Sequence, residues 1–380
     1  MDFKLNEEQQ LMRDMFREYA QKELKAIAAK LDEEEHFPIE LIPQMAEIGL
    51  LGIPVPDDFG GIGLGAFENA MAIEELSKVC AITGATICMH SAFCCDSIVA
   101  FGTDEQKEAY LPVLASGEKL GAFALTEPGA GSDAAAQKAT AEDKGDHYLL
   151  NGNKIFISNG SYADIYIVFA VTDKAAGRNG ISAFILEKGM EGFEFGSKEK
   201  KMGIRGSATY ELIFRDVKVP KENLLGKEGE GFKIAMASID AGRIGIAAQA
   251  LGIAQGAIDE TVPYVQQREQ FGKPLSQFQN TQFELAEMQT KVDAARLLVY
   301  QAACTKDIGQ PYGHLASMAK LFAAEAASDV TRRCLQLFGG YGYTREYPME
   351  RMMRDAKITE LYGGTNEIQK IVISKWMGVR

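Results

Sequence analysis

The sequence has no excess of basic residues. It contains 40 lysines and arginines against 53 aspartates and glutamates, so its formal net charge is -13. Binding to a nucleic-acid backbone needs clustered lysine and arginine, and we therefore expect no nucleic-acid partner. A phosphorylated small ligand held by a few local basic groups is compatible with this charge.

The common patterns of cysteine chemistry are missing too. The six cysteines form no C-x-x-C pair, and no cysteine–histidine cluster has the spacing of a zinc site. The adjacent Cys94 and Cys95 stand in an apolar stretch that we expect to be helical, where buried free thiols are favoured over a redox pair. We therefore expect no metal site and a reducing compartment.

Long apolar runs are also lacking. No stretch reaches the ~18 apolar residues of a membrane span. Residues 1–8 are charged and have no apolar core of a signal peptide. We expect a soluble, cytoplasmic protein without a membrane span. With 380 residues, of which 46% are hydrophobic, the chain is long enough for two or three domains with substantial cores.

The pattern of residues changes twice along the chain. Apolar residues recur at helical spacing in the first part, where Asn6 is a suitable N-cap. Runs of strand formers such as residues 165–171 follow, with Asn151-Gly152 typical of a hairpin turn. Long alanine-rich helices then return, with expected interruptions around Gly256 and Pro263.

This order predicts an α+β protein of three domains. We expect an N-terminal helical domain over residues 1–119 and a middle antiparallel β-barrel or sandwich over 120–227. The remaining residues, 228–380, are predicted to form a C-terminal four-helix bundle.

The stretch Gly121-Ala-Phe-Ala-Leu-Thr-Glu-Pro-Gly-Ala-Gly-Ser-Asp133 is the clearest candidate for a binding loop. It begins apolar, as a strand does, and then becomes polar and rich in glycine. Gly129 and Gly131 allow close approach to the backbone, and Thr126 and Ser132 supply hydroxyl groups. Such a loop suits a ligand that needs main-chain and hydroxyl hydrogen bonds. An ordinary strand-to-loop turn explains the stretch equally well.

Five further stretches can likewise be interpreted either as parts of a binding site or as ordinary structural features. Taken singly, they are explained by helix caps, a partner for a helix dipole or a surface ion pair. They are Phe156-Ile-Ser158, Asp240-Ala-Gly-Arg243, Arg268-Glu-Gln-Phe-Gly272, Gln336-Leu-Phe-Gly-Gly340 and Tyr362-Gly-Gly-Thr-Asn-Glu367.

Taken together and in this order, these stretches make the chain resemble the acyl-CoA dehydrogenases over nearly its whole length. The resemblance is closest to the short-chain or butyryl-type members. It implies a homotetrameric flavoprotein that binds FAD. It also implies the α,β-dehydrogenation of acyl-CoA thioesters to 2-enoyl-CoA, or the reverse, with electrons exchanged with an electron-transfer flavoprotein.

The resemblance also implies a role for each matching residue. Those expected to line or cover the flavin are Phe123, Leu125, Thr126, Gly131, Ser132, Phe156, Ile157 and Ser158. Those expected to hold the ADP part are Arg268, Phe271 and Gln279, together with Gln336, Phe338, Gly339 and Gly340 from a neighbouring subunit. Those expected to cap the other end of FAD are Thr365, Asn366 and Glu367. Those expected to contact the acyl-CoA are Ser132, Phe232, Met236, Asp240, Arg243, Tyr362, Gly363 and Gly364.

The general base is where the chain departs from the family. Removing the weakly acidic α-proton of a thioester needs a base, and most members carry a glutamate where this chain has Gly363. The alternative position used by some members is also glycine here, Gly242. Asp240 and Glu367 are the nearest carboxylates in the sequence and are candidate substitutes. The missing glutamate would also leave room for a bulkier acyl group.

The glycine at position 363 has two further interpretations. In the first, a dehydrogenase has lost its base and kept its binding sites. In the second, the chain runs a reaction that needs no α-base, such as reduction of an activated enoyl-CoA or an elimination like desulfination. A protein of a different class, a non-catalytic CoA-ester binder, is the remaining alternative.

Overall fold

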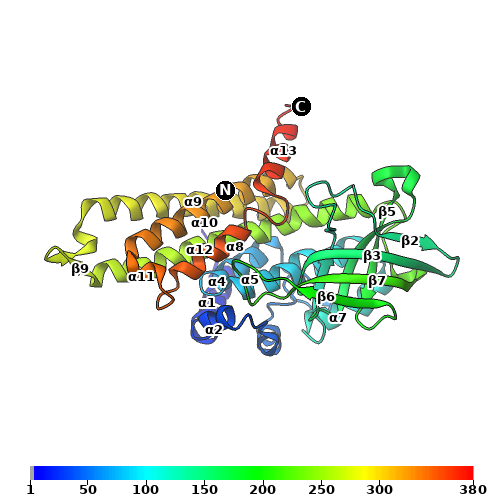
Figure 1. Cartoon of the computed structure of the whole chain (residues 1–380), viewed down its shortest axis with the longest axis horizontal. Coiled ribbons are helices and arrows are strands. Elements are labelled where there is room, and N and C mark those ends of the chain that lie inside the picture. The colour runs from blue at the N-terminus through cyan, green and yellow to red at the C-terminus, as the bar shows by residue number, and fades with distance from the viewer. Residues whose placement is uncertain (1–3, 380) are drawn as a thin grey trace.

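The computed structural model describes residues 4–379 and has a helical part, a sheet and a second helical part in chain order (Figure 1). The N-terminal helices are α1 (Glu7–Tyr19), α2 (Ala28–Glu33), α3 (Ile42–Glu47), α4 (Ala66–Ser77), α5 (Ala81–Ile87), α6 (Asp96–Phe101) and α7 (Asp104–Ala115). The prediction of an α+β protein with helical, β and helical parts is confirmed.

Local signals set the first helix as predicted. The Asn6 side chain accepts a hydrogen bond from the Gln9 N–H at 2.8 Å, and the Gln9 side chain accepts one from the Asn6 N–H, which makes a capping box. Cys94 and Cys95 are both buried free thiols, as expected.

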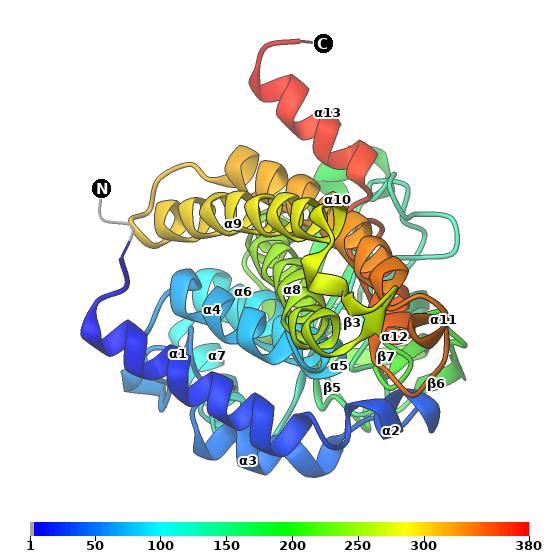
Figure 2. The same ribbon diagram turned by 90° about the vertical axis from the view of Figure 1, so that its left-hand side faces the viewer.

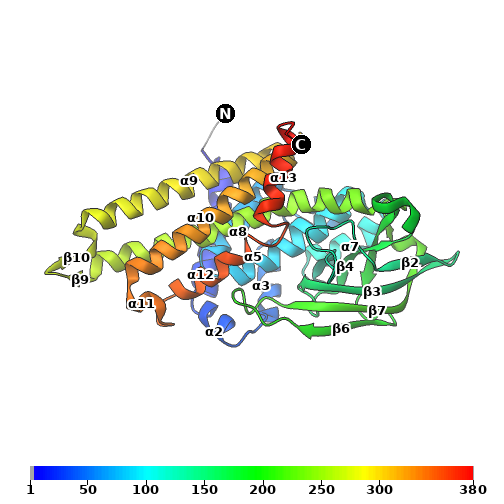
Figure 3. The same cartoon turned by 45° about the horizontal axis from the view of Figure 1, so that its top comes forward.

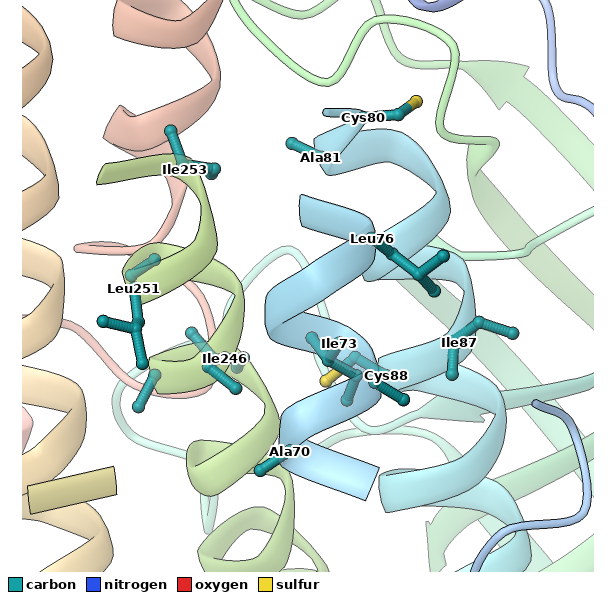
Figure 4. Close-up of a cluster of buried hydrophobic side chains, with 14 of the residues drawn as sticks. Ala70, Ile73, Leu76, Cys80, Ala81, Ile87, Cys88, Ile246, Leu251 and Ile253 are labelled. Carbon is teal, nitrogen blue, oxygen red and sulfur yellow. The ribbon is translucent and has the colours of Figure 1, made fainter. Parts of the chain in front are cut away.

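One helical stretch departs from the expectation about apolar runs. Ala81–Phe101, which comprises α5, a π-helix (Cys88–Cys95) and α6, is long and apolar enough to cross a membrane by length and composition. However, 78% of that window is buried inside the protein. Figure 4 shows Ile87 and Cys88 of this stretch beside α4, in the same cluster of buried side chains as Ile246 of α8 (Gly231–Gln267).

The sheet is mainly, but not wholly, antiparallel. Its strands are β1 (Gly121–Ala124), β2 (Thr140–Asp143), β3 (His147–Ser158), β4 (Ile165–Val171), β5 (Ile181–Glu187), β6 (Phe193–Lys198), β7 (Thr209–Pro220) and β8 (Leu224–Leu225). They run in the order β6-β7-β3-β2-β4-β5-β8, and β4 pairs in parallel with both β1 and β2. Alternate residues of β4 enter two different cores, so this strand is buried on both faces.

The predicted hairpin at Asn151-Gly152 is wrong. Both residues lie inside the continuous strand β3, which pairs with β7, and Gly152 (φ +133°) marks a bulge in that pairing. A Cβ at Gly152 would lie 2.7 Å from Ala139 Cα. Only glycine therefore allows β3 to pack this closely against Ala139, the residue before β2. The turn lies instead between β2 and β3, where the Lys144 N–H donates to His147 O.

The C-terminal part contains the longest helices of the described chain. Its elements are α8 (Gly231–Gln267), β9 (Glu269–Gln270), β10 (Lys273–Pro274), α9 (Gln279–Asp307), α10 (Gly313–Phe338), α11 (Gly340–Tyr343), α12 (Met349–Ile358) and α13 (Asn366–Trp376). The predicted interruptions at Gly256 and Pro263 do not occur, because α8 is continuous. Gly256 instead allows α8 to approach the backbone after α4, since its Cβ would lie 2.0 Å from Lys78 O.

The helix α8 joins the two ends of the molecule. It runs from the sheet to the β9–β10 hairpin at the opposite end, with α9 and α10 alongside it (Figures 1 and 3). Figure 2 shows α13 projecting from the bundle, and its contacts are with the first half of α10, where His314 stacks on Trp376. The part of α8 nearest the sheet faces the candidate site.

Candidate functional site

Two adjoining cavities lie between the sheet, the start of α8 and the loop before α13. Their volumes are about 290 and 590 Å³. We call the smaller one the inner cavity and the larger one the outer cavity. The residues that line both are Thr126, Gly131, Ser132, Phe156, Ser158, Tyr362, Gly363 and Gly364.

The inner cavity gathers most of the residues expected at the flavin and the acyl group. Residues that were expected at the site and line this cavity alone are Phe123, Leu125, Ile157, Phe232, Met236 and Arg243. Met89, Phe93 and Ile239 also line it. Phe93 packs against Phe123 with ring centroids 5.2 Å apart, so aromatic rings form part of its wall.

The boundary between the two cavities presents side-chain hydroxyl groups that have no hydrogen-bond partner between residues 4 and 379. The side-chain hydroxyls of Thr126, Ser132 and Ser158 make no hydrogen bond within the described residues. Phe156 is 59% exposed at the end of β3 and has φ +59°, an uncommon backbone conformation for a bulky residue. An exposed aromatic face and several free hydroxyls therefore face the same space.

Gly363 lies at this boundary in a left-handed conformation, with φ +64°. A Cβ there would lie 2.4 Å from Ile246 Cδ1, so an apolar methyl group occupies the space beside it. The expectation of room for a bulkier acyl group next to Gly363 stays a prediction. A Cβ at Gly242 would lie 2.0 Å from Phe93 Cζ, so the Phe93 ring occupies the space beside the second expected base position.

The two carboxylates considered as substitute bases lie elsewhere. Asp240 forms an ion pair with Arg243 at 2.6 Å and lines neither cavity. Glu367 is exposed in the first turn of α13 and also lines neither. Among the described residues, the acids that do line the cavities are Asp133 in the inner one and Glu199 in the outer one.

Three side chains hold the carbonyls of the Gly363–Gly364 segment from behind. Arg243 Nε donates to Gly363 O at 3.2 Å, and Lys320 Nζ donates to Gly364 O at 2.9 Å. Gln369 Nε2 donates to both carbonyls, at 3.3 and 2.9 Å. Burial and the neighbouring Arg243 lower the pKa of Lys320 to about 7. The Gly363–Gly364 segment is therefore fixed by donors from α8, α10 and α13.

Asn366, expected at the end of FAD, takes part in the same network. It is buried and accepts from Lys320 Nζ at 3.0 Å, whereas Thr365, the residue before α13, lines the outer cavity.

Residues 200–204 form a wall of the outer cavity that sequence reasoning missed. Ile204 has φ +41°, a strained value for a β-branched residue. Its N–H donates to Asp355 Oδ1 at 2.5 Å, and Arg354 Nη1 donates to Met202 O at 3.0 Å. Burial lowers the pKa of Lys201, in the same wall, to about 8. A glycine on each side, Gly203 and Gly206, was the available signal.

A third cavity of about 490 Å³ lies at the other end of α8. Of the residues expected at the ADP part, Arg268, Phe338, Gly339 and Gly340 line it, and Phe271, Gln279 and Gln336 do not. Phe271 is 95% exposed at the tip of the β9–β10 hairpin. Arg268 is roughly 38 Å along α8 from Arg243 at 1.5 Å per residue. Arg268 and Phe338 to Gly340 therefore belong to one place in one subunit, which differs from the expected split between subunits.

No group of three or more His, Cys, Asp or Glu residues able to hold a metal ion occurs between residues 4 and 379.

Family comparisons cover nearly the whole chain. Residues 6–118, 122–217 and 229–378 match the families described as "Acyl-CoA dehydrogenase, N-terminal domain", "Acyl-CoA dehydrogenase, middle domain" and "Acyl-CoA dehydrogenase, C-terminal domain".

Individual relatives are similar over their full length. The "Acyl-CoA dehydrogenase, short-chain specific" of Clostridium acetobutylicum is 54% identical over 374 residues, which cover 98% of this chain and 99% of the relative. The "Acryloyl-CoA reductase (NADH)" of Anaerotignum propionicum is 51% identical over 377 residues, covering 99% of this chain and 95% of the relative.

A solved structure has the same fold throughout. One of its chains superposes with a TM-score of 0.98 and 55% identity, covering 99% of both chains. That structure is described as "Electron transferring flavoprotein of Acidaminococcus fermentans: Towards a mechanism of flavin-based electron bifurcation".

Proposed function

Because the chain belongs to the acyl-CoA dehydrogenase family, we propose that it interconverts short-chain acyl-CoA and 2-enoyl-CoA with bound FAD and without a carboxylate base at position 363. The observation that carries this proposal is the pair of adjoining cavities whose shared boundary includes Gly363. The short-chain assignment is supported by the relative from Clostridium acetobutylicum.

The residues at the boundary fit a flavin ring. Phe156 offers an exposed aromatic face, and Thr126, Ser132 and Ser158 offer free hydroxyls to the polar edge of a planar heterocycle. When bound there, FAD supplies the acceptor or donor of the hydride at the β-carbon, while the protein supplies orientation and electrostatics. The inner cavity, with its apolar wall, would take the acyl group.

The Gly363–Gly364 segment includes the position where most members of the family are expected to carry a glutamate that removes the α-proton. Arg243, Lys320 and Gln369 hold the Gly363–Gly364 segment in place, but no carboxylate is attached to it. Proton exchange at the α-carbon would then depend on water. A positioned base contributes typically 10²–10⁴-fold, and its absence slows both directions because their ratio is set by the equilibrium.

We propose that the FAD site is shared between two copies of the chain. The Arg268 cavity fits a phosphate-bearing group, since Arg268 lies there beside the exposed Gly339 and Gly340. Along α8, Arg268 lies roughly 38 Å from Arg243, which lines the inner cavity of the same subunit, at 1.5 Å per residue. A second copy would have to bring its Arg268 to the first copy's flavin. Exposed apolar side chains on the C-terminal helices support the proposed homotetramer: Phe283, Leu297, Phe322, Ile371 and Trp376.

We also propose an electron-transfer flavoprotein as the redox partner, on the basis of the solved structure that the chain resembles. Reduction of an activated enoyl-CoA is the second candidate function, because the chain is 51% identical to an acryloyl-CoA reductase.

The test is an anaerobic half-reaction with protein carrying stoichiometric FAD. We expect crotonyl-CoA to reoxidise the chemically reduced flavin slowly but completely, and acetyl-CoA, which has no β-carbon beyond its methyl group, to leave it reduced. A protein that is purified without FAD and does not take it up would refute the proposal. So would a reduced flavin that none of a panel of short 2-enoyl-CoA esters reoxidises.

A further inference from the structure

Lys154 is a lysine whose side chain is wholly buried beneath the site. It lies in β3 and is 0% exposed. Its ammonium donates to Leu125 O at 3.1 Å, to Glu127 Oε1 at 2.8 Å and to Gln137 Oε1 at 2.8 Å. All three of its donors are therefore used. Burial lowers the pKa of Lys154 to about 8, although Glu127 acts in the opposite direction.

Glu127 continues this network into the loop that lines the cavities. Its carboxylate accepts from the Lys138 N–H at 2.6 Å and from the Ala139 N–H at 3.1 Å. Its backbone closes a tight turn, because the Glu127 and Ala130 N–H groups each donate to the other's carbonyl at 3.1 Å. The following strand residue joins the same loop, since the Ile155 N–H donates to Thr126 O at 2.9 Å.

The direction of one peptide group follows from these contacts. In a trans peptide the C=O and the next N–H point in opposite directions. Leu125 O points into the protein toward Lys154, so the N–H of Thr126 points away from it. Thr126 lines both cavities, and its N–H has no hydrogen-bond partner within residues 4–379. A free N–H donor is therefore held at the cavity boundary.

A buried ion pair is a costly way to stabilise a fold. Desolvation of two charges often exceeds their attraction, and apolar replacements of equal size are frequently as stable or more so. Tyr148, Leu150 and Ile157 of the same strand are buried in an apolar core, so the strand tolerates apolar residues. The pair at Lys154 and Glu127 thus calls for a reason other than stability.

We propose that Lys154 is a positioning residue that turns the Leu125–Thr126 peptide so that the Thr126 N–H faces the bound flavin ring. This inference rests on the proposed function. A fixed N–H donor favours a ring that has gained negative charge on reduction. Lys154 would therefore raise the affinity for reduced FAD more than for oxidised FAD, without touching either.

The test compares two variants that lack the same ion pair. Glu127→Gln leaves the Lys154 donor to Leu125 O in place, whereas the double variant Lys154→Met/Glu127→Gln removes it. An ion pair that lines neither cavity serves as control: Arg296→Met breaks the 3.1 Å contact with Glu74. Each protein is loaded with FAD, and we measure the FAD dissociation constant, the midpoint potential by dye equilibration, and the urea midpoint.

We expect the double variant to lose about tenfold of the preference for reduced over oxidised FAD. For a two-electron couple that is a potential about 30 mV more negative. Glu127→Gln and Arg296→Met should lower the urea midpoint while keeping the wild-type potential. If the double variant does not fold, Lys154→Gln, which keeps an amide NH₂ donor without the charge, should show a potential that is more negative than that of wild type by less than about 30 mV.

A double variant that binds FAD with the wild-type potential would overturn the inference and leave Lys154 a purely structural residue. So would variants whose potentials follow their urea midpoints, including that of Arg296→Met. Wild-type protein that binds no FAD would instead refute the proposed function, and the two failures are therefore distinguishable.

Discussion

Restoring a carboxylate at position 363 should convert the protein into a fast dehydrogenase, whereas the second position, 242, should not accept one. The first change is Gly363→Glu. The left-handed backbone at 363 costs a non-glycine residue about 1–2 kcal/mol. Moving Ile246 Cδ1 away from the new Cβ costs about 1 kcal/mol more. Both costs are small enough for a folded protein to tolerate.

The gain in rate should be much larger than this cost. A positioned base contributes typically 10²–10⁴-fold, or about 3–5 kcal/mol of barrier. The assay is anaerobic mixing of FAD-loaded protein with butyryl-CoA, followed by the loss of flavin absorbance. Gly363→Gln is the matched control, because it has the same size and no basic oxygen, and it should stay at the wild-type rate.

Gly242→Glu should give no such gain. Its Cβ would meet three atoms of the Phe93 ring at 2.0, 2.1 and 2.5 Å. The ring is buried against Phe123 and cannot swing aside as a flexible chain end can. The reasoning is refuted if wild type reduces its flavin as fast as Gly363→Glu, if Gly363→Gln matches Gly363→Glu, or if Gly242→Glu gives the larger rate.

Three further predictions test other parts of the site. The pKa of Lys320 is about 7 in the folded chain and 10.5 ordinarily. Between pH 7 and pH 10.5 the lysine is therefore protonated mainly in the unfolded chain, and the free energy of unfolding rises with pH. The unfolding free energy of wild type relative to Lys320→Met, from urea titrations, should therefore increase by about 2 kcal/mol from pH 7 to pH 9, and a constant difference would contradict this. Asp355→Ala should release the strained Ile204 wall, so that limited trypsin cleaves after Lys201 at least tenfold faster than in wild type, and equal cleavage rates would show that Asp355 does not hold the wall. Arg268→Glu should weaken FAD binding more than tenfold in equilibrium dialysis, although Arg268 is remote from the flavin cavities of its own subunit, and unchanged binding would argue against a shared site.

Much of the site was accessible from the sequence because its parts are short and local. The loop around Thr126 and the strand end at Phe156 each carry their own pattern of glycine, proline and hydroxyl residues. The structure brings both to the same boundary, with Gly363 from more than 200 residues further along. The order of helical and strand periodicities was likewise enough for the fold class.

The wrong secondary-structure predictions occur where tertiary packing overrides the local conformational preference of the residues. Asn151-Gly152 has the composition of a hairpin turn. Pairing with β7 nevertheless continues on both sides of these residues, so β3 is one strand with a bulge at this point. Gly256 has a low helix propensity, yet it is what lets α8 approach the backbone at Lys78. Neither contact partner can be identified from the neighbouring residues in the chain.

Two features of the site depend on contacts between residues far apart in the sequence, which no short sequence motif can show. The strained backbone at Ile204 is held by a hydrogen bond from its N–H to Asp355 of α12, which is 151 residues away in the sequence. The grouping of Arg268 with Phe338 to Gly340 arises because the ends of α8 and α10 meet. Motif matching predicted one ligand for all these residues, but it could not show that Arg268 lies far along α8 from the cavity that Thr126 lines in the same subunit.

The central claim is that the site binds a short acyl-CoA beside FAD without a base at position 363. Exchange of the α-protons of butyryl-CoA in deuterated water tests it most directly, because exchange needs a base but no net oxidation. We predict that FAD-loaded wild type exchanges no faster than the buffer and that Gly363→Glu exchanges at least a hundredfold faster. Exchange by wild type at the rate of Gly363→Glu would show that another group removes the proton and would contradict the account.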